Sequence, residues 1–220
     1  MGHYSAVRRA SAVLALLASA VPASTAFELR FDRPVLEAAL SIGQSRVQTV
    51  HTRFHEPYRI KVAAAPVDFV EIVTPFRKVV LAAESAWRTA GSLYGLRAAQ
   101  ETLGAGDEVA VYVEMTFHPH NTFIGMPDYR IALGQDGNDV LPASIERIPR
   151  SGPRLEDVPS ISLPVPGGVV TPKRSQPVTG GTLIAHFATG ILDAQGIYEV
   201  RVLDGAKALG TARVDFSKLR

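Results

Sequence analysis

The histidines are the side chains in this sequence with the clearest potential for chemistry. Five of them follow residue 26: His51, His55, His118, His120 and His186. Imidazole is the commonest metal ligand in proteins, so a metal site is the most specific hypothesis that the residue types allow. The first two lie four residues apart and share a face if they lie on a helix. The next two share a face if they lie on one strand.

A copper or zinc site would form if the two histidine pairs converged in the folded chain. Met126 would add a thioether, which is a soft ligand suited to copper. Pro119 opposes this arrangement because it can end a strand between His118 and His120. The helical pair also lacks the glutamate that follows the first histidine in the zinc-protease helix motif. We predict that His118 and His120 begin a turn and that the protein holds no cofactor, with the copper or zinc site as the alternative hypothesis.

The same segment offers a possible apolar contact surface. The stretch FHPHNTFIGMPDY, residues 117–129, combines aromatic, isoleucine and methionine side chains with turn-forming residues. Aromatic residues and methionine are favoured in the cores of protein interfaces. The candidate contact residues are Phe117, Phe123, Ile124, Met126 and Tyr129. The alternative is that these side chains close one end of a hydrophobic core.

The sequence contains no recognisable catalytic motif. It has no Gly-x-Ser-x-Gly nucleophile elbow and no Ser-x-x-Lys set. It also has no cysteine, which excludes thiol catalysis and thiolate metal sites. Carboxylates such as Glu71, Glu114 and Asp128 are present, but their spacing does not pair them for acid–base chemistry. We therefore predict a non-catalytic binding or assembly module that contacts another protein or a surface component.

Residues 1–26 have the pattern of a secretory signal peptide. Arg8 and Arg9 precede an apolar run, and small residues lead up to Ala26. The run is shorter than the roughly 20 residues that span a bilayer, and no later stretch is long and apolar enough for a transmembrane segment. The pattern predicts a periplasmic or secreted protein after cleavage near Ala26.

The charge balance argues against a nucleic-acid partner. The chain has 23 Lys and Arg residues against 21 Asp and Glu residues, and two of the arginines fall within residues 1–26. The predicted mature chain is therefore formally neutral. A nucleic-acid binder normally has a basic surface that neutralises phosphates. A protein or surface component remains the expected partner.

The N-terminal part of the predicted mature chain has a helical pattern. Residues 27–57 form a predicted helical segment, with Asp32 as the helix cap and Pro34 in the first turn. Gly43 falls inside the apolar periodicity and can break the segment into two helices. A second helical stretch at about 75–103 is predicted as an insertion within the β-rich region.

This insertion has clear start signals and one apolar stripe. Thr74 is placed to cap the helix, and Pro75 stands at the first helical position. Trp87 lies on the apolar stripe and is expected in the core. Glu84 and Arg88 lie four residues apart, in the favourable orientation for a surface ion pair.

The remainder of the sequence, residues 58–220, is predicted to be one β-sandwich domain. From residue 108 the apolar residues alternate with polar ones, which is typical of a half-buried strand. The expected inward face holds Val109, Val111, Val113, Met115 and Phe117. Residues 149–177 hold seven of the fifteen prolines and are predicted as a long loop.

The stretch LDAQGIYEV, residues 192–200, resembles the penultimate strand of immunoglobulin-like domains. Leu192, Asp193, Gly196 and Tyr198 match that pattern in order, with one additional residue before the glycine, and Val200 stands where the cysteine would be. The resemblance implies a tyrosine corner, in which the phenol bonds a nearby backbone group. The predicted fold class is therefore mainly β: an immunoglobulin-like antiparallel β-sandwich with helices in the N-terminal half.

Overall fold

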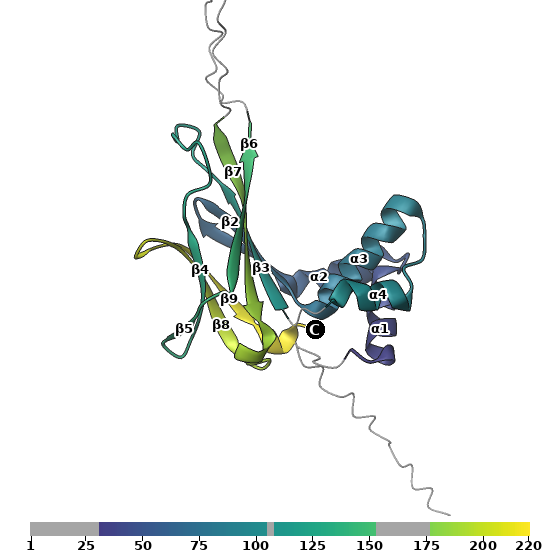
Figure 1. Ribbon diagram of the computed structural model, residues 1–220. Helices are drawn as coiled ribbons and strands as arrows, with labels where there is room; N and C mark the ends of the chain where they lie inside the picture. The colour runs from purple at the N-terminus through teal and green to yellow at the C-terminus, as the bar shows by residue number, and fades with distance from the viewer. Residues whose placement is uncertain (1–30, 105–107, 153–176) are drawn as a thin grey trace, which may run out of the picture.

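The computed structural model describes residues 31–104, 108–152 and 177–220. These residues form two antiparallel β-sheets and four α-helices, with the helices in the N-terminal half (Figure 1). The prediction of a mainly β protein with N-terminal helices is confirmed. The predicted signal peptide at residues 1–26 and the greater part of the proline-rich loop lie outside the described residues.

One sheet has five strands and the other has four, and every neighbouring pair is antiparallel. The five-stranded sheet runs in the order β1 (Arg59–Ala64), β2 (Val67–Val73), β3 (Glu108–Thr116), β7 (Val178–Ala188) and β6 (Ser144–Ser151). The four-stranded sheet runs in the order β5 (Asn138–Val140), β4 (Arg130–Gln135), β8 (Ile197–Asp204) and β9 (Lys207–Asp215). The proline-rich loop therefore begins later than predicted: Pro149 lies within β6, an edge strand, where proline is tolerated.

Strand β3 supplies the centre of the hydrophobic core. Its alternation is confirmed, because the four apolar residues on its inward face have no exposed surface and Phe117, just after the strand, is 5 % exposed. Side chains from both sheets belong to the same core cluster, for example Val111 on β3 and Val200 on β8.

The turn before β8 is fixed by a buried tyrosine. Tyr198 is almost fully buried, and its hydroxyl accepts a hydrogen bond from the backbone N–H of Asp193 at 2.7 Å. A hairpin joins β8 to β9: Asp204 pairs with Lys207, and Gly205 adopts a positive φ of 58° in the turn.

The four helices are α1 (Arg33–Gly43), α2 (Gln48–His55), α3 (Pro75–Ala90) and α4 (Leu96–Leu103). The predicted caps are confirmed, since the Asp32 side chain accepts from the N–H of Val35 and Thr74 accepts from the N–H of Arg77. The predicted break at Gly43 also separates α1 from α2. Within the described residues, none of these helices has the length and apolar character needed to cross a membrane.

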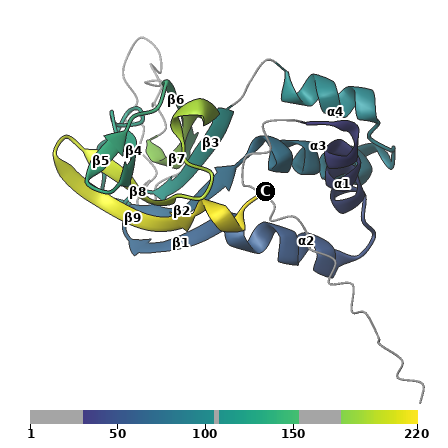
Figure 2. The same ribbon diagram turned by 90° about the horizontal axis from the view of Figure 1, so that it is seen from below.

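The helices form a group of their own beside the ends of the strands (Figures 1 and 2). Three of them pack around a small core of Leu36, Ala39, Phe76, Val79, Val80 and Ala99. Phe54 on α2 packs against this core and against the core of the sheets. The chain end lies at the junction, where the Arg220 carbonyl accepts hydrogen bonds from the hydroxyls of Tyr58 and Thr74.

Candidate metal centre

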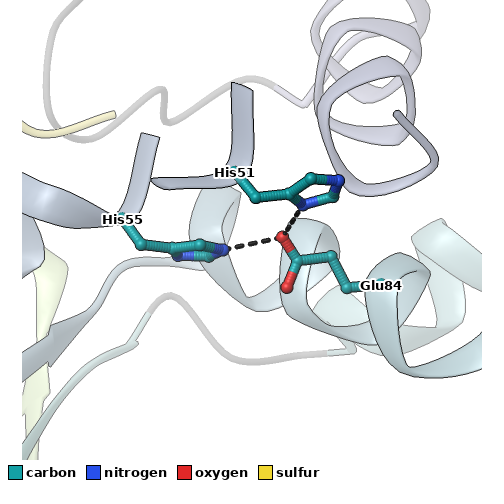
Figure 3. Close-up of side chains that lie close together, drawn as sticks. All are labelled: His51, His55 and Glu84. Carbon is teal, nitrogen blue, oxygen red and sulfur yellow. Dashed lines mark hydrogen bonds and ion pairs between the residues drawn. The ribbon is translucent and has the colours of Figure 1, made fainter. Parts of the chain in front are cut away.

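Three potential metal ligands meet between α2 and α3. His51 and His55 extend from α2 toward Glu84 on α3, and both rings contact the same carboxylate oxygen (Figure 3). The Nε2 atom of His55 lies 2.7 Å from Glu84 Oε1, and the Nδ1 atom of His51 contacts the same oxygen. One ligand atom of each residue lies within 4.8 Å of the other two. It is the one such group of histidine and acidic side chains among the described residues.

The helices bring these side chains together for identifiable local reasons. Residues four apart on a helix lie on the same face, so both histidines of the short helix α2 point toward α3. The end of α1 lies directly on α3 at Gly43, where an added Cβ atom would lie 2.6 Å from the Val80 carbonyl oxygen. The same added atom would lie 3.3 Å from the backbone nitrogen of Glu84, so the turn into α2 starts directly beside Glu84.

The electrostatics of His51 and Glu84 favour a charged pair. The Nε2 atom of His51 lies 2.7 Å from the Ser45 carbonyl oxygen, while Nδ1 faces Glu84, so both nitrogens face acceptors. Burial alone lowers the pKa of His51, but the hydrogen bonds to Ser45 and Glu84 and the Glu84 charge outweigh burial, and the net pKa is raised. Burial raises the pKa of Glu84, but the hydrogen bonds from His51 and His55 outweigh it and lower the pKa.

His55 is held differently, because an arginine donates to its second nitrogen. The Nε–H group of Arg77 donates to Nδ1 of His55 at 3.3 Å, so the ring proton lies on Nε2 and points at Glu84. Arg77 is 3 % exposed and also donates to Glu71 and to the Ile72 carbonyl. A metal ion on Nε2 would move the ring proton to Nδ1. Arg77 would then have to release its long bond to His55 and keep its other two.

Two imidazole nitrogens and one carboxylate oxygen form a ligand set that Zn²⁺ uses in open sites. Ligand atoms about 2.0–2.1 Å from a tetrahedral ion lie about 3.3 Å from one another. The distance of 2.7 Å between His55 and Glu84 must therefore increase by about 0.6 Å, which a rotation of the Glu84 side chain supplies. The bond from His51 to the Ser45 carbonyl suits a metal ligand, since ligating histidines usually donate their other N–H to such a group.

The three residues open onto a cleft of about 670 Å³. Its walls are completed by the end of α1, the first residues of α2 and the last turns of α3, with Arg46, Trp87 and Arg88 among the lining residues. Trp87 is thus half-buried on the cleft wall, and the expectation that it packs in the core is wrong. Its ring instead lies under the guanidinium of Arg46, 5.4 Å from the ring centre.

The other predicted metal ligands lie elsewhere. Near the helices, Ala110 of strand β3 pairs with the last residue of β2. The other end of β3, at Thr116, lies about 20 Å away along the strand. His118 and His120 follow Thr116 as exposed residues with ring centres 5.1 Å apart. The backbone N–H of His120 donates to the His118 ring, as in the predicted turn.

Met126 and the predicted contact residues mostly complete the hydrophobic core. Phe117 and Tyr129 are each 5 % exposed, and Phe123 and Met126 pack against the core cluster. The ring of Phe117 contacts Phe123 edge-on, with centroids 5.0 Å apart. Ile124 alone among the five predicted contact residues is strongly exposed, at 84 %. A partner that contacts this loop stays a prediction.

Glu84 was absent from the predicted ligands because its sequence pattern indicates a surface pair with Arg88. That expectation is wrong: Glu84 is 7 % exposed and bonds the two histidines instead. The sequence did contain a signal, since Arg77 and Glu84 lie seven residues apart beside the apolar stripe of α3 and so share one helical face. Two opposite charges at the border of a buried stripe indicate partners on another element.

No protein-family model, no curated protein and no solved structure matches this sequence. The function of the site therefore has to be inferred from its residues and their geometry.

Proposed function

We propose that the protein binds one divalent transition-metal ion, such as Zn²⁺, through His51, His55 and Glu84. The observation that supports this is the convergence of three ligand atoms from two helices within 4.8 Å, on the wall of a cleft. The cleft leaves room for a water molecule or another ligand at the remaining coordination position, as in open zinc sites.

Zinc fits this ligand set better than reduced copper does. Soft thioether and thiolate ligands select Cu(I), and the nearby ligands here are nitrogen and oxygen atoms. Met126 packs against the core of the sheets, with its sulfur close to Gly181 on β7, and is not part of the cluster. Cu²⁺ binds most nitrogen and oxygen sites more tightly than Zn²⁺ does, so it is the natural competitor in a binding experiment.

We infer binding without catalysis for this cleft. A zinc hydrolase needs a general base beside the metal-bound water, commonly a carboxylate. Among the described residues that line the cleft, Glu84 is the only acidic one, and it serves as a ligand. The position after His51 is Thr52, whose hydroxyl donates to the Gln48 carbonyl on its own helix.

We also propose the cellular location and the fold that the sequence predicts. The protein is exported after cleavage near Ala26, and its two sheets form an immunoglobulin-like sandwich. The hydrogen bond of the Tyr198 hydroxyl to the Asp193 backbone supports the second part, because a tyrosine corner makes such a bond.

Zinc titration with matched histidine variants tests the metal site. The protein is purified without a histidine tag, stripped with a chelator, dialysed against Zn²⁺ and analysed for bound metal, with Cu²⁺ as a competitor. We expect one Zn²⁺ per chain. His51→Ala and His55→Ala should each weaken binding by more than the roughly 10- to 100-fold that loss of an outer hydrogen-bond partner costs.

The double variant His118→Ala/His120→Ala is the matched control, because it removes the other histidine pair. It should retain zinc with unchanged affinity. Loss of zinc in this control, or no retention at micromolar zinc in the wild type, would refute the proposed site.

A further inference from the structure

Two arginines make the cleft cationic. Arg46 and Arg88 line it together with the two histidines. Within the described part of the chain, neither guanidinium forms an ion pair with a carboxylate. Glu84 is the one acidic lining residue there, and it is already shared by His51 and His55. The cleft therefore has an excess of positive charge over the carboxylates that line it.

The position of Arg46 prepares it to bind an anion. Its guanidinium lies over the Trp87 ring, with Cζ 5.4 Å from the ring centre. This cation–π contact does not use up the N–H donors of the guanidinium, which suit a carboxylate or phosphate group. Such pairs are often bidentate, which adds strength and geometric specificity.

The size of the cleft suits a small organic molecule. Its volume of about 670 Å³ falls within the range of roughly 300–1,000 Å³ that is usual for ligand pockets. The exposed part of Trp87 gives the wall an apolar, aromatic surface beside the two arginines. A ligand that combines an acidic group with a planar or apolar body would contact both.

We infer that this cleft binds a small organic anion whose carboxylate or phosphate group lies between Arg46 and Arg88. The inference goes beyond the metal site and does not depend on it, because neither Arg46 nor Arg88 is one of the proposed metal ligands. When Zn²⁺ is bound, its charge adds to that of the arginines, so the metal should strengthen anion binding.

The single tryptophan of the sequence provides the measurement. Trp87 lines the cleft, so its fluorescence reports directly on a bound ligand. The full chain is titrated with inorganic phosphate and, separately, with benzoate at constant ionic strength, first with a chelator and then with Zn²⁺. The two anions distinguish a phosphate site from a carboxylate site. We expect a saturable change with at least one of them.

Charge-removing variants make the test specific. Arg46→Gln and Arg88→Gln should each weaken anion binding by about tenfold or more, because each removes a charged hydrogen-bond donor. Arg53→Gln is the matched control, since Arg53 is an exposed residue of α2 that does not line the cleft. It should bind the anion as the wild type does.

The outcomes separate this inference from the proposed metal site. If neither anion gives a saturable change, or if Arg53→Gln weakens binding as much as Arg88→Gln does, the anion site is refuted even when zinc binds. If binding depends on Arg46 and Arg88 in a protein that retains no zinc, the anion site stands and the metal site is refuted.

Discussion

Replacing Glu84 by glutamine removes the charge that holds the histidine cluster together. In the metal-free protein, one Glu84 oxygen contacts both His51 and His55, and the Glu84 side chain is 9 % exposed. A hydrogen bond to a charged group contributes about 1.5–3 kcal/mol, and the glutamine oxygen keeps part of this because it can still accept from one ring. Both rings are partly exposed, so we expect Glu84→Gln to lower the free energy of unfolding by about 2 kcal/mol near pH 5.5.

The size of this loss should depend on pH in a defined direction. The pKa of Glu84 is lowered, so its contribution is present above the ordinary value of 4.5 and is lost as the pH falls through the folded value. The pKa of His51 is raised, so its contribution is present below the ordinary value of 6.5 and is lost as the pH rises through the folded value. The difference between wild type and variant should therefore be largest between about pH 4.5 and 6.5.

Urea unfolding with a chelator present, followed by circular dichroism across this pH range, measures the difference. Glu101→Gln is the control, because Glu101 forms an exposed ion pair with Arg97 on α4. It should change the free energy of unfolding by less than about 0.5 kcal/mol at every pH. Equal stability of wild type and Glu84→Gln between pH 4.5 and 6.5, or a gap that grows steadily into alkaline pH, would refute the charged pair.

Three further predictions follow from the packing and the proposed metal site. Gly43→Ala should destabilise the protein by about 1–3 kcal/mol and weaken zinc binding, because the new methyl group would press on the Val80 carbonyl. The control Gly125→Ala, where an added Cβ meets no atom within 4 Å, should change neither the stability nor the zinc affinity. Tyr198→Phe should cost about 1–2 kcal/mol in urea unfolding by leaving the Asp193 N–H without its partner, while zinc affinity stays unchanged. Zinc at a hundredfold excess over its dissociation constant should raise the free energy of unfolding by about 2.7 kcal/mol, measured by thermal or urea denaturation.

The elements that the sequence predicted well are those set by neighbouring residues. Asp32 and Thr74 act as caps because each lies directly before a helix and its side chain reaches an N–H three residues later. The alternation of β3 follows from the two-residue period of a strand with one face in the core. The i, i+4 spacing that places His51 and His55 on one face is equally local, so both histidines were found as candidates.

The features that the sequence could not predict depend on tertiary contacts. Glu84 matches a surface pair with Arg88 when α3 is considered alone, and only the approach of α1 at Gly43 and the course of α2 make it a partner of the histidines. Trp87 lies on an apolar stripe, yet the stripe extends beyond the part of α3 that other elements cover. In both cases the helix was predicted correctly and its environment was not.

The candidate site also explains how α2 is held in place. No residue of α2 is fully buried, and its main apolar contact is Phe54, whose ring lies 5.2 Å from Tyr58 and 6.0 Å from Phe76. An eight-residue helix with so little buried surface is marginal by itself and needs tertiary contacts. The bonds from His51 and His55 to Glu84 supply a second attachment, between chain segments that β1 and β2 separate in the sequence. A metal ion bound by the same three residues would replace two hydrogen bonds by coordination bonds across that junction. The proposed metal ion would therefore strengthen the docking of α2 onto α3.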